Sequence, residues 1–276
     1  MAYKKILTIQ DISCVGQCSL TVALPILSAC GLETCVLPSA VLSTHTAFDN
    51  FTFRDLTEDI PEILQVWEKE KIRFEAMYTG YLGSAKQIGY VAQIFDTVAT
   101  EDCIKVVDPA MADNGKLYPG FDMDFVSAMK ELCKKADYVL PNLTEACLLT
   151  GLPYKTEYDQ GYIDALLEGL VTMGCKNVIL TGVSYTTGKT GVVVLENGVH
   201  TYYEHSKLGN NCHGTGDVYA STFVGSLLRG KAAFDAAKIA ADYTVACIKE
   251  TIKLQNHWYG VAFEPVLSQL IEALKQ

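Results

Sequence analysis

The feature that most constrains the fold is a regular alternation of short apolar runs with longer amphipathic segments. The first run, KKILTIQD, is typical of a buried strand, and residues 19–31 follow with helical spacing and end at a glycine. The alternation continues as far as the run NVILTGV, residues 177–183. Strands that alternate with helices build a mostly parallel sheet with helices on both faces. The sequence therefore predicts an α/β protein with three layers.

The later part of the chain predicts an edge hairpin and more helices. Residues 190–205 are two β-rich runs joined by Asn197 and Gly198, a pair typical of a tight hairpin turn. No repeat, linker or low-complexity tract interrupts the chain, so we expect a single domain over residues 1–276. The remaining expected strands are 33–43, 74–83, 103–111 and 137–145, and the expected helices are 56–72, 84–100, 122–136, 145–151, 163–174, 217–228 and 231–251.

Composition excludes several classes of function. The net charge of −10 argues against a nucleic-acid surface, which needs clustered Lys and Arg. Ten cysteines without a C-x-x-C pair, and five scattered histidines, give no zinc spacing and are typical of a reducing compartment. The N-terminus enters a strand pattern at once, and no apolar run approaches the ~20 residues of a membrane span. We therefore expect a soluble cytoplasmic protein with no membrane contact.

One motif resembles a phosphate-binding loop but does not fit it. The stretch GVSYTTGKT, residues 182–190, has five residues between its glycines where that loop has four. It also leads into the strand run GVVVLENG, whereas the loop must open a helix whose amides hold phosphate. We expect a flexible hairpin connection here.

The stretch GTGD, residues 214–217, stands at the start of a predicted helix. Backbone N–H groups of Gly214, Thr215 and Gly216 at a helix N-terminus can form an anion site. Asp217 beside that site can accept a proton from an attacking hydroxyl group while the amides stabilise a transferring phosphoryl group. The same four residues also fit an ordinary capped helix with a tight turn.

More carboxylates follow the predicted strands. Asp108 ends a buried strand with Asp113 five residues on, and a carboxylate there needs solvent, a partner or a metal. Asn142 and Glu145 follow the next strand, where Glu145 could hold Mg²⁺. The alternative is a helix start, with Asn142 as cap and Glu145 in the first turn.

Polar groups also follow the early strands: Asp11, the segment 43–46 and the segment 79–81. Taken singly these are loops, and an isolated His45 is more often structural than catalytic. Together with the carboxylates and the anion site, they indicate a phosphotransferase acting on a small aromatic or polyol substrate.

The chain resembles the pyridoxal (vitamin B6) kinases of the ribokinase-like superfamily nearly from end to end. The first strand KKILTIQD with its following turn resembles that of the family, STHTAF resembles its SNHT segment, and TGYLGSA its substrate-side turn. DPAMAD resembles DPVxGD, PNLTEA resembles PNxxE, and GTGD matches the catalytic signature. The resemblance implies a ribokinase-like three-layer sandwich, ATP with Mg²⁺, and a homodimer; a monovalent cation such as K⁺ is left open.

The resemblance also implies roles for individual residues. Asp217 would deprotonate the 5′-hydroxymethyl group of the vitamer, with the amides of residues 214–216 as anion hole. Thr46 and Tyr81 would face the pyridine ring, with His45 as a neighbour. The nucleotide side would use Asp108, Asn142, Glu145, Thr181, Gly182 and Lys207, and the metal would lie at Asp108, Asp113 and Glu145.

The sequence departs from the family pattern at two places. Relatives carry Ser-His where this chain has Asp11 and Ile12, and the hypothesis is that Asp11 binds the ring and favours the cationic vitamer pyridoxamine. Gly182 stands where some relatives carry Lys or Ser.

The alternative enzyme is a hydroxymethylpyrimidine kinase, although that branch often has Cys in place of Asp217. A sugar kinase would need a larger lid than residues 31–73 allow, and a binding or sensor protein would need neither base nor anion hole.

Overall fold

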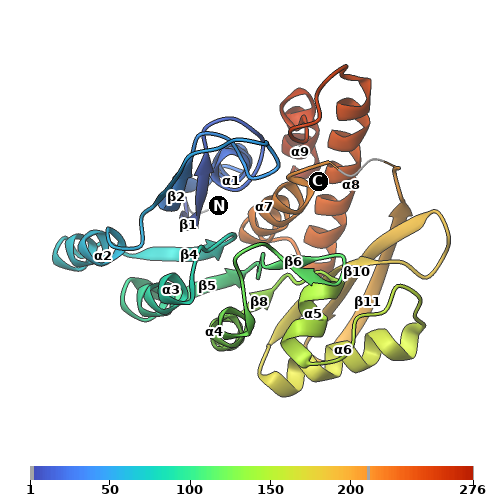
Figure 1. Ribbon diagram of the computed structural model, residues 1–276, viewed down its shortest axis with the longest axis horizontal. Helices are drawn as coiled ribbons and strands as arrows, with labels where there is room; N and C mark the ends of the chain where they lie inside the picture. Colours follow the sequence, from blue (N-terminus) through green and yellow to red (C-terminus); the bar gives the residue numbers. More distant parts are fainter. Residues whose placement is uncertain (1–2, 210–211, 276) are drawn as a thin grey trace.

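A single sheet runs through the computed structural model, which describes residues 3–209 and 212–275. Nine strands lie in the order β11-β10-β9-β8-β5-β4-β1-β2-β3 within the described residues, and a short separate hairpin is formed by β6 and β7 (Figure 1). The strands are β1 Lys5–Ser13, β2 Glu33–Leu42, β3 Phe53–Asp55, β4 Phe74–Thr79, β5 Ala99–Val107, β6 Ala112–Asp113, β7 Lys116–Leu117, β8 Tyr138–Val139, β9 Asn177–Val183, β10 Lys189–Glu196 and β11 Val199–Ser206.

The centre of the sheet is parallel and both edges are antiparallel. The five adjacent pairs from β2 through β1, β4, β5 and β8 to β9 are parallel. Strand β10 pairs antiparallel with β9 and with β11, and Asn197 and Gly198 turn the hairpin with φ of 53° and 78°. The predicted edge hairpin and mostly parallel sheet are therefore confirmed. The opposite edge, where β3 pairs antiparallel with β2, was not predicted, because a three-residue strand leaves no periodic signal.

Helices cover both faces of the sheet (Figure 1). One layer holds α1, α7, α8 and α9, and the other holds α2 to α6. Their bounds are α1 Leu20–Ala29, α2 Ile60–Lys69, α3 Ala85–Thr97, α4 Met123–Lys134, α5 Leu143–Thr150, α6 Gln160–Met173, α7 Thr215–Leu228, α8 Ala233–Lys253 and α9 Leu267–Ala273, with a 3₁₀ turn η1 at Glu264–Val266.

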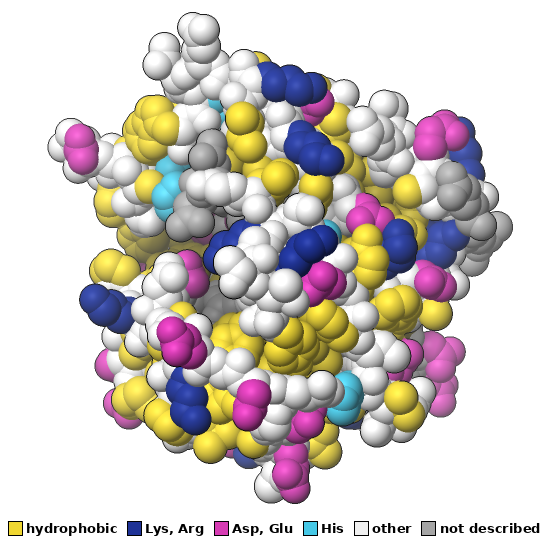
Figure 2. Space-filling model, turned by 90° about the vertical axis from the view of Figure 1, so that its right-hand side faces the viewer, with side chains coloured by type: hydrophobic (Ala, Val, Ile, Leu, Met, Phe, Trp, Pro, Cys, Tyr) yellow, Lys and Arg dark blue, Asp and Glu magenta, His cyan; other side chains and the backbone are white. Residues whose placement is uncertain are grey.

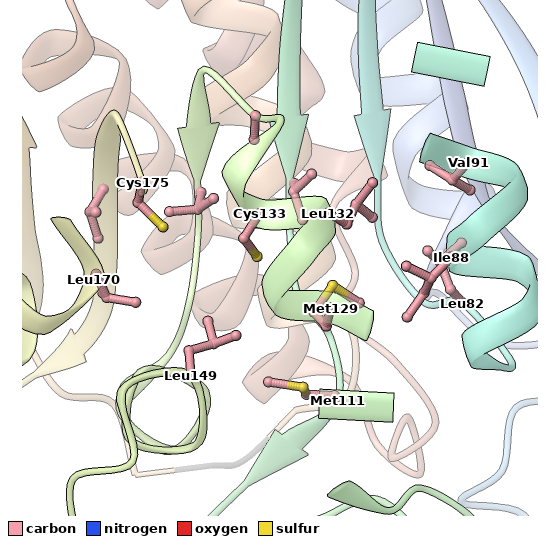
Figure 3. Packing of buried hydrophobic residues seen from close by; sticks show 14 of the residues in the cluster. Leu82, Ile88, Val91, Met111, Met129, Leu132, Cys133, Leu149, Leu170 and Cys175 are labelled. Carbon is pink, nitrogen blue, oxygen red and sulfur yellow. The ribbon is translucent and has the colours of Figure 1, made fainter. Parts of the chain in front are cut away.

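Alternate residues of the central strands enter two separate cores. On β4, Met77 packs with the α2–α6 layer and Tyr78 with the α1/α7 layer, and both side chains are fully buried. Figure 3 shows the first of these cores, where Met129 and Leu132 of α4 lie beside Ile88 and Val91 of the neighbouring helix α3. Burial on both faces explains why the strands are continuous apolar runs rather than alternating ones.

Two predicted elements are shorter or shifted. The strand expected at 137–145 is only Tyr138–Val139, because the proline at 141 cannot donate to a ladder and Asn142 caps the next helix. Strand β5 begins at Ala99, four residues before its expected start, since helix α3 already ends at Thr97. The stretch at 182–190 joins β9 to β10 and leads into a strand, as expected of a hairpin connection.

The surface carries charges of both signs. Figure 2 shows Lys and Arg side chains interspersed with Asp and Glu over one face, with no large patch of either sign. In the part of the chain that the structure describes, no helix is long and apolar enough to cross a membrane.

Candidate functional site

The carboxyl ends of five neighbouring strands meet at one edge of the sheet. Backbone hydrogen bonds continue the ladder just past the strands, from the N–H of Asp108 to Thr79 O at 3.0 Å and from the N–H of Thr181 to Pro141 O at 3.0 Å. Ligands of open α/β sheets bind at this edge. The fold therefore brings the sequence motifs together because each one directly follows or ends a strand.

Helix α7 begins at this edge with a glycine that no other residue can replace without strain. Gly214 is the N-cap with φ of 81°, a left-handed conformation that favours glycine. A Cβ atom on it would overlap the carbonyl oxygen of Gln17. The first N–H groups of the helix, from Thr215 onward, have no intrahelical partners and carry the positive end of the helix dipole. The start of α7 can therefore bind an anion, and Gly214 there contacts the carbonyl oxygen of Gln17 in the β1–α1 loop.

Asp217 lies in the first turn of α7 and is half-buried. Loss of solvent raises the pKa of its carboxyl from 3.8 to about 7, and the negative charge of Asp11 adds to this. The nearby backbone N–H of Ser19 favours the charged form and opposes the rise in the pKa. A carboxyl with a pKa near neutrality is suited to accept and release a proton at physiological pH.

Asn142 and Glu145 form a reciprocal cap at the start of α5. The N–H of Glu145 donates to Asn142 Oδ1 at 3.0 Å, and the N–H of Asn142 donates to Glu145 Oε2 at 2.8 Å. The other oxygen, Oε1, accepts from the N–H of Met111 at 3.0 Å. Glu145 is 2% exposed, and burial raises its pKa. The cap interpretation is therefore correct for the local structure. The same hydrogen bonds hold the Glu145 carboxyl in place near the carboxyl ends of the strands.

Asp108 brings a second carboxyl to the same place. Burial raises its pKa well above the ordinary value, and the charges of Glu145 and Asp217 raise it further. Asp108 Oδ1 accepts from the N–H of Ala110 at 3.1 Å. Among residues 3–209 and 212–275 no Lys, Arg or His forms an ion pair with any of these three carboxylates. Carboxylates without a cationic partner, two of which raise the pKa of the third, fit a site for a hard divalent cation.

Asp113 does not join these carboxylates. It is exposed on β6, and its two oxygens accept from the N–H and the side-chain amide of Asn114. Within the described residues, no group of three or more His, Cys, Asp or Glu side chains is gathered closely enough to hold a metal ion. Asp113 is exposed on the β6–β7 hairpin, although its charge contributes to the raised pKa of Glu145. The metal set of Asp108, Asp113 and Glu145 therefore stays a prediction.

The predicted substrate side is lined by Asp11 and Tyr81. Asp11 is 5% exposed on β1, accepts from Ser13 Oγ at 3.3 Å, and has its pKa raised by burial. Tyr81 stacks on Phe121 with ring centroids 5.5 Å apart, and burial raises the pKa of its hydroxyl with a further contribution from the charge of Asp11. The two side chains therefore lie within electrostatic reach of each other at the carboxyl ends of β1 and β4.

His45 has both ring nitrogens engaged by the backbone. Nδ1 accepts from the N–H of Ala47 at 3.2 Å, so Nε2 carries the proton and donates to Tyr259 O at 2.7 Å. The ring is buried against Gly16, where a Cβ would overlap it. His45 thus ties the β2–β3 loop to the C-terminal segment, while the next residue, Thr46, is exposed.

Two of the residues predicted to contact the nucleotide, Gly182 and Lys207, are exposed. Gly182 is exposed with φ of 76° at the end of β9, where the register of β9 and β10 shifts. Thr181 Oγ1 donates to Pro141 O at 3.4 Å, and Thr181 also pairs with Asn142 across an isolated bridge. Lys207 is exposed just after β11, and its N–H donates to Gly188 O at 2.9 Å.

Two contacts at the site were not predicted from the sequence. Ser19, expected only as a helix start, has a left-handed conformation with φ of 50° and lies near enough to Asp217 for its backbone N–H to lower the pKa of that carboxyl. Gln17 pairs with Gly260 across an isolated parallel bridge, so the C-terminal segment reaches the start of α7. Neither has a sequence signal, because both depend on contacts between segments far apart in the chain.

The comparisons with known proteins agree with this geometry. Residues 42–262 match a family model described as phosphomethylpyrimidine kinase. A structure of a candidate phosphomethylpyrimidine kinase from Bacteroides thetaiotaomicron, solved with pyridoxal, is 37% identical with a TM-score of 0.92, covering 98% of this chain and 96% of that one. The pyridoxal kinase of Lactobacillus plantarum is 31% identical with a TM-score of 0.91, covering 98% of both chains.

A curated relative, the pyridoxal kinase of Dictyostelium discoideum, is 28% identical over 242 residues, which is 82% of this chain and 78% of the relative. The three-layer architecture predicted from the resemblance is confirmed by these structural matches.

Proposed function

The chain belongs to the phosphomethylpyrimidine kinase family, and from that membership we propose that it transfers the γ-phosphoryl group of ATP to the 5′-hydroxymethyl group of a B6 vitamer. Pyridoxal, pyridoxine and pyridoxamine are the candidate substrates, and the whole chain acts as one catalytic domain. The observation that carries the proposal is Asp217, a carboxyl with a pKa of about 7 at the mouth of an anion-binding helix.

In the proposed reaction, Asp217 takes the proton of the substrate hydroxyl as its oxygen forms a bond to the γ-phosphorus. The bond from that phosphorus to the β,γ-bridging oxygen breaks, and ADP leaves with the electron pair. The amides of Gly214, Thr215 and Gly216 bind the transferring group as its charge spreads over three oxygens. The proton on Asp217 then passes to solvent, which its near-neutral pKa allows.

On the nucleotide side, Asp108 and Glu145 would hold Mg²⁺, with Asn142 beside them and Asp113 nearby on the β6–β7 hairpin. Mg²⁺ supplies charge neutralisation on the phosphates of ATP. Glu145 is fixed for this by the N–H groups of Asn142 and Met111. Thr181 and Gly182 would contact the nucleotide through the backbone at the end of β9, and Lys207 through its exposed ammonium group.

On the vitamer side, Tyr81 and Thr46 would face the pyridine ring, and Asp11 would accept a hydrogen bond from it. A buried carboxyl without a cationic partner favours a substrate that brings a positive charge. Asp11 is buried with no ion pair in the described part of the chain, so the proposal includes a preference for pyridoxamine.

The second candidate is phosphorylation of hydroxymethylpyrimidine, which the description of the matched family favours. Both substrates offer a hydroxymethyl group on a planar heteroaromatic ring, so the same base and anion hole would serve either. A binding protein without turnover is the non-enzymatic alternative, and it would leave Asp217 without a role.

The test is an ATP-dependent assay on pyridoxal, pyridoxine, pyridoxamine and hydroxymethylpyrimidine, with the product identified by mass and Asp217→Asn as the control. The proposal expects a vitamer 5′-phosphate and ADP in equal amounts from the wild type. Binding without product for all four compounds would support the sensor alternative and reject the kinase.

We further propose a cytoplasmic homodimer. All ten cysteines are free thiols, as expected in a reducing compartment. Light scattering coupled to size exclusion gives the oligomeric state directly, and a monomer at micromolar concentration would refute the dimer.

A further inference from the structure

Four aromatic side chains from three separate segments meet beside the start of α7. The ring of His45 lies 4.9 Å from that of Phe48 and 4.9 Å from that of His213, which precedes Gly214. The ring of Trp258 lies 4.6 Å from Phe48 and 6.5 Å from His45. We call His45, Phe48, His213 and Trp258 the aromatic rim. It joins the β2–β3 loop, the C-terminal segment and the residue next to the anion-binding turn.

Backbone contacts fix the C-terminal part of this rim to the site. Tyr259 O accepts from His45 Nε2 at 2.7 Å, and Gly260 pairs with Gln17, whose carbonyl oxygen lies against Gly214. The side chain of Gln17 also contacts Gly260 closely. Trp258 is therefore held within two residues of a contact to the start of α7.

Trp258 is 54% exposed although its ring lies within this cluster. The other tryptophan, Trp67, packs at 5.3 Å against Phe74 in the opposite helical layer. An indole offers a large apolar face that favours a planar ring as partner. Trp258 thus presents apolar surface that its neighbours in the chain leave uncovered.

We propose that Trp258 forms the outer wall of the substrate site and packs its indole against the heteroaromatic ring of the bound substrate. The inference rests on the proposed function, since that function supplies the planar ring. The ring of His45 packs against Gly16, which follows Asp11 in the β1–α1 connection, and the ring of His213 directly precedes the turn that leads to Asp217, so the rim lies beside the residues proposed to bind the substrate. An apolar wall here selects an aromatic substrate over a polyol and shields the ring from water.

The test measures binding of pyridoxine without ATP, by calorimetry and by tryptophan emission. Trp258→Ala is expected to raise the Kd by about 3- to 10-fold, the range typical of an aromatic contact. Trp258→Phe keeps a ring and is expected to stay within about twofold of the wild type. The KM for ATP should remain unchanged in both variants, because the aromatic contacts of Trp258 are to His45, Phe48 and Tyr259, none of which is assigned to the nucleotide.

Trp67→Phe is the matched control, because it leaves Trp258 as the only tryptophan in the chain. Its emission should change on binding pyridoxine, with a Kd equal to that of the wild type by calorimetry. If Trp258→Ala does not fold, the emission of Trp67→Phe on addition of pyridoxine still tests the inference.

An unchanged Kd in Trp258→Ala, or a tryptophan emission of Trp67→Phe that is the same with and without pyridoxine, overturns the inference while leaving the proposed function intact. Failure of the proposed function looks different, because the wild type would then phosphorylate none of the vitamers.

Discussion

Replacing Asp217 by Asn should nearly abolish turnover and at the same time stabilise the fold. Asn has nearly the same size and shape as Asp, but its side-chain amide cannot take the proton of an attacking hydroxyl. Loss of a general base typically costs about 10²- to 10⁴-fold in rate. We therefore expect kcat to fall by at least about 100-fold with little change in the KM for ATP.

The stability gain follows from the pKa of the same carboxyl, which burial raises from 3.8 to about 7. Between pH 3.8 and about 7, Asp217 is ionised in the unfolded chain but still protonated in the folded one. The free energy of unfolding of the wild type therefore falls as the pH rises through this range, and it stays at the reduced value above pH 7. The side-chain amide of the Asp217→Asn variant has no such proton to release. At about 1.4 kcal/mol per pKa unit the full effect would be about 4 kcal/mol at pH 8, and partial contact of Asp217 with solvent reduces it to about 1–2 kcal/mol.

Thermal unfolding of the two proteins at pH 5 and pH 8 measures this difference. The variant should unfold about 2–6 °C higher than the wild type at pH 8, and the gain should be smaller at pH 5. In parallel, kcat/KM of the wild type should rise with pH through about 7 and then level off. A variant that is as active as the wild type, or less stable than it at pH 8, would refute the assignment of Asp217 as a desolvated base.

Three further substitutions test the surroundings of this base. Gly214→Ala should lower the free energy of unfolding by about 2 kcal/mol or more and should also lower kcat, because the φ of Gly214 is 81° and a Cβ would overlap the carbonyl oxygen of Gln17. Chemical denaturation and turnover measurements check this, and a denaturation midpoint equal to that of the wild type contradicts it. Glu145→Gln should raise the KM for ATP and shift its Mg²⁺ dependence to higher concentration while the cap with Asn142 persists through one oxygen; unchanged Mg²⁺ dependence speaks against Glu145 as a metal group. Asp11→Ser should lower the preference for pyridoxamine over pyridoxal, read from the ratio of the two kcat/KM values, and an equal ratio in both proteins rejects the role of Asp11.

Much of the fold could be predicted because its signals are local. Apolar runs, the Asn197-Gly198 turn and the glycine at 214 act through neighbouring residues, so the parallel sheet, the edge hairpin and the start of α7 follow from the sequence. The strand-end carboxylates at Asp108 and Glu145 could be predicted for the same reason, since parallel strands carry their following residues to one edge.

The rest depends on contacts between distant segments. Nothing near His45 in the sequence indicates that its ring donates to Tyr259, more than two hundred residues away. Trp258 has no periodic or motif signal, and its place beside the site follows only from folding of the C-terminal segment onto the β1–α1 loop. The position of Asp113 also depends on such contacts: its spacing from Asp108 predicts a shared metal site, and the structure places it exposed on the two-residue strand β6.

The central claim is phosphoryl transfer to a B6 vitamer, and a competition experiment tests it most directly. Pyridoxal, pyridoxine, pyridoxamine and hydroxymethylpyrimidine are mixed in equal amounts with limiting ATP, and the ratio of the phosphorylated products gives the ratio of the kcat/KM values. We predict that vitamer 5′-phosphates dominate, with pyridoxamine 5′-phosphate the most abundant among them. A product pool dominated by hydroxymethylpyrimidine phosphate, or ATP left unconsumed, would contradict the account.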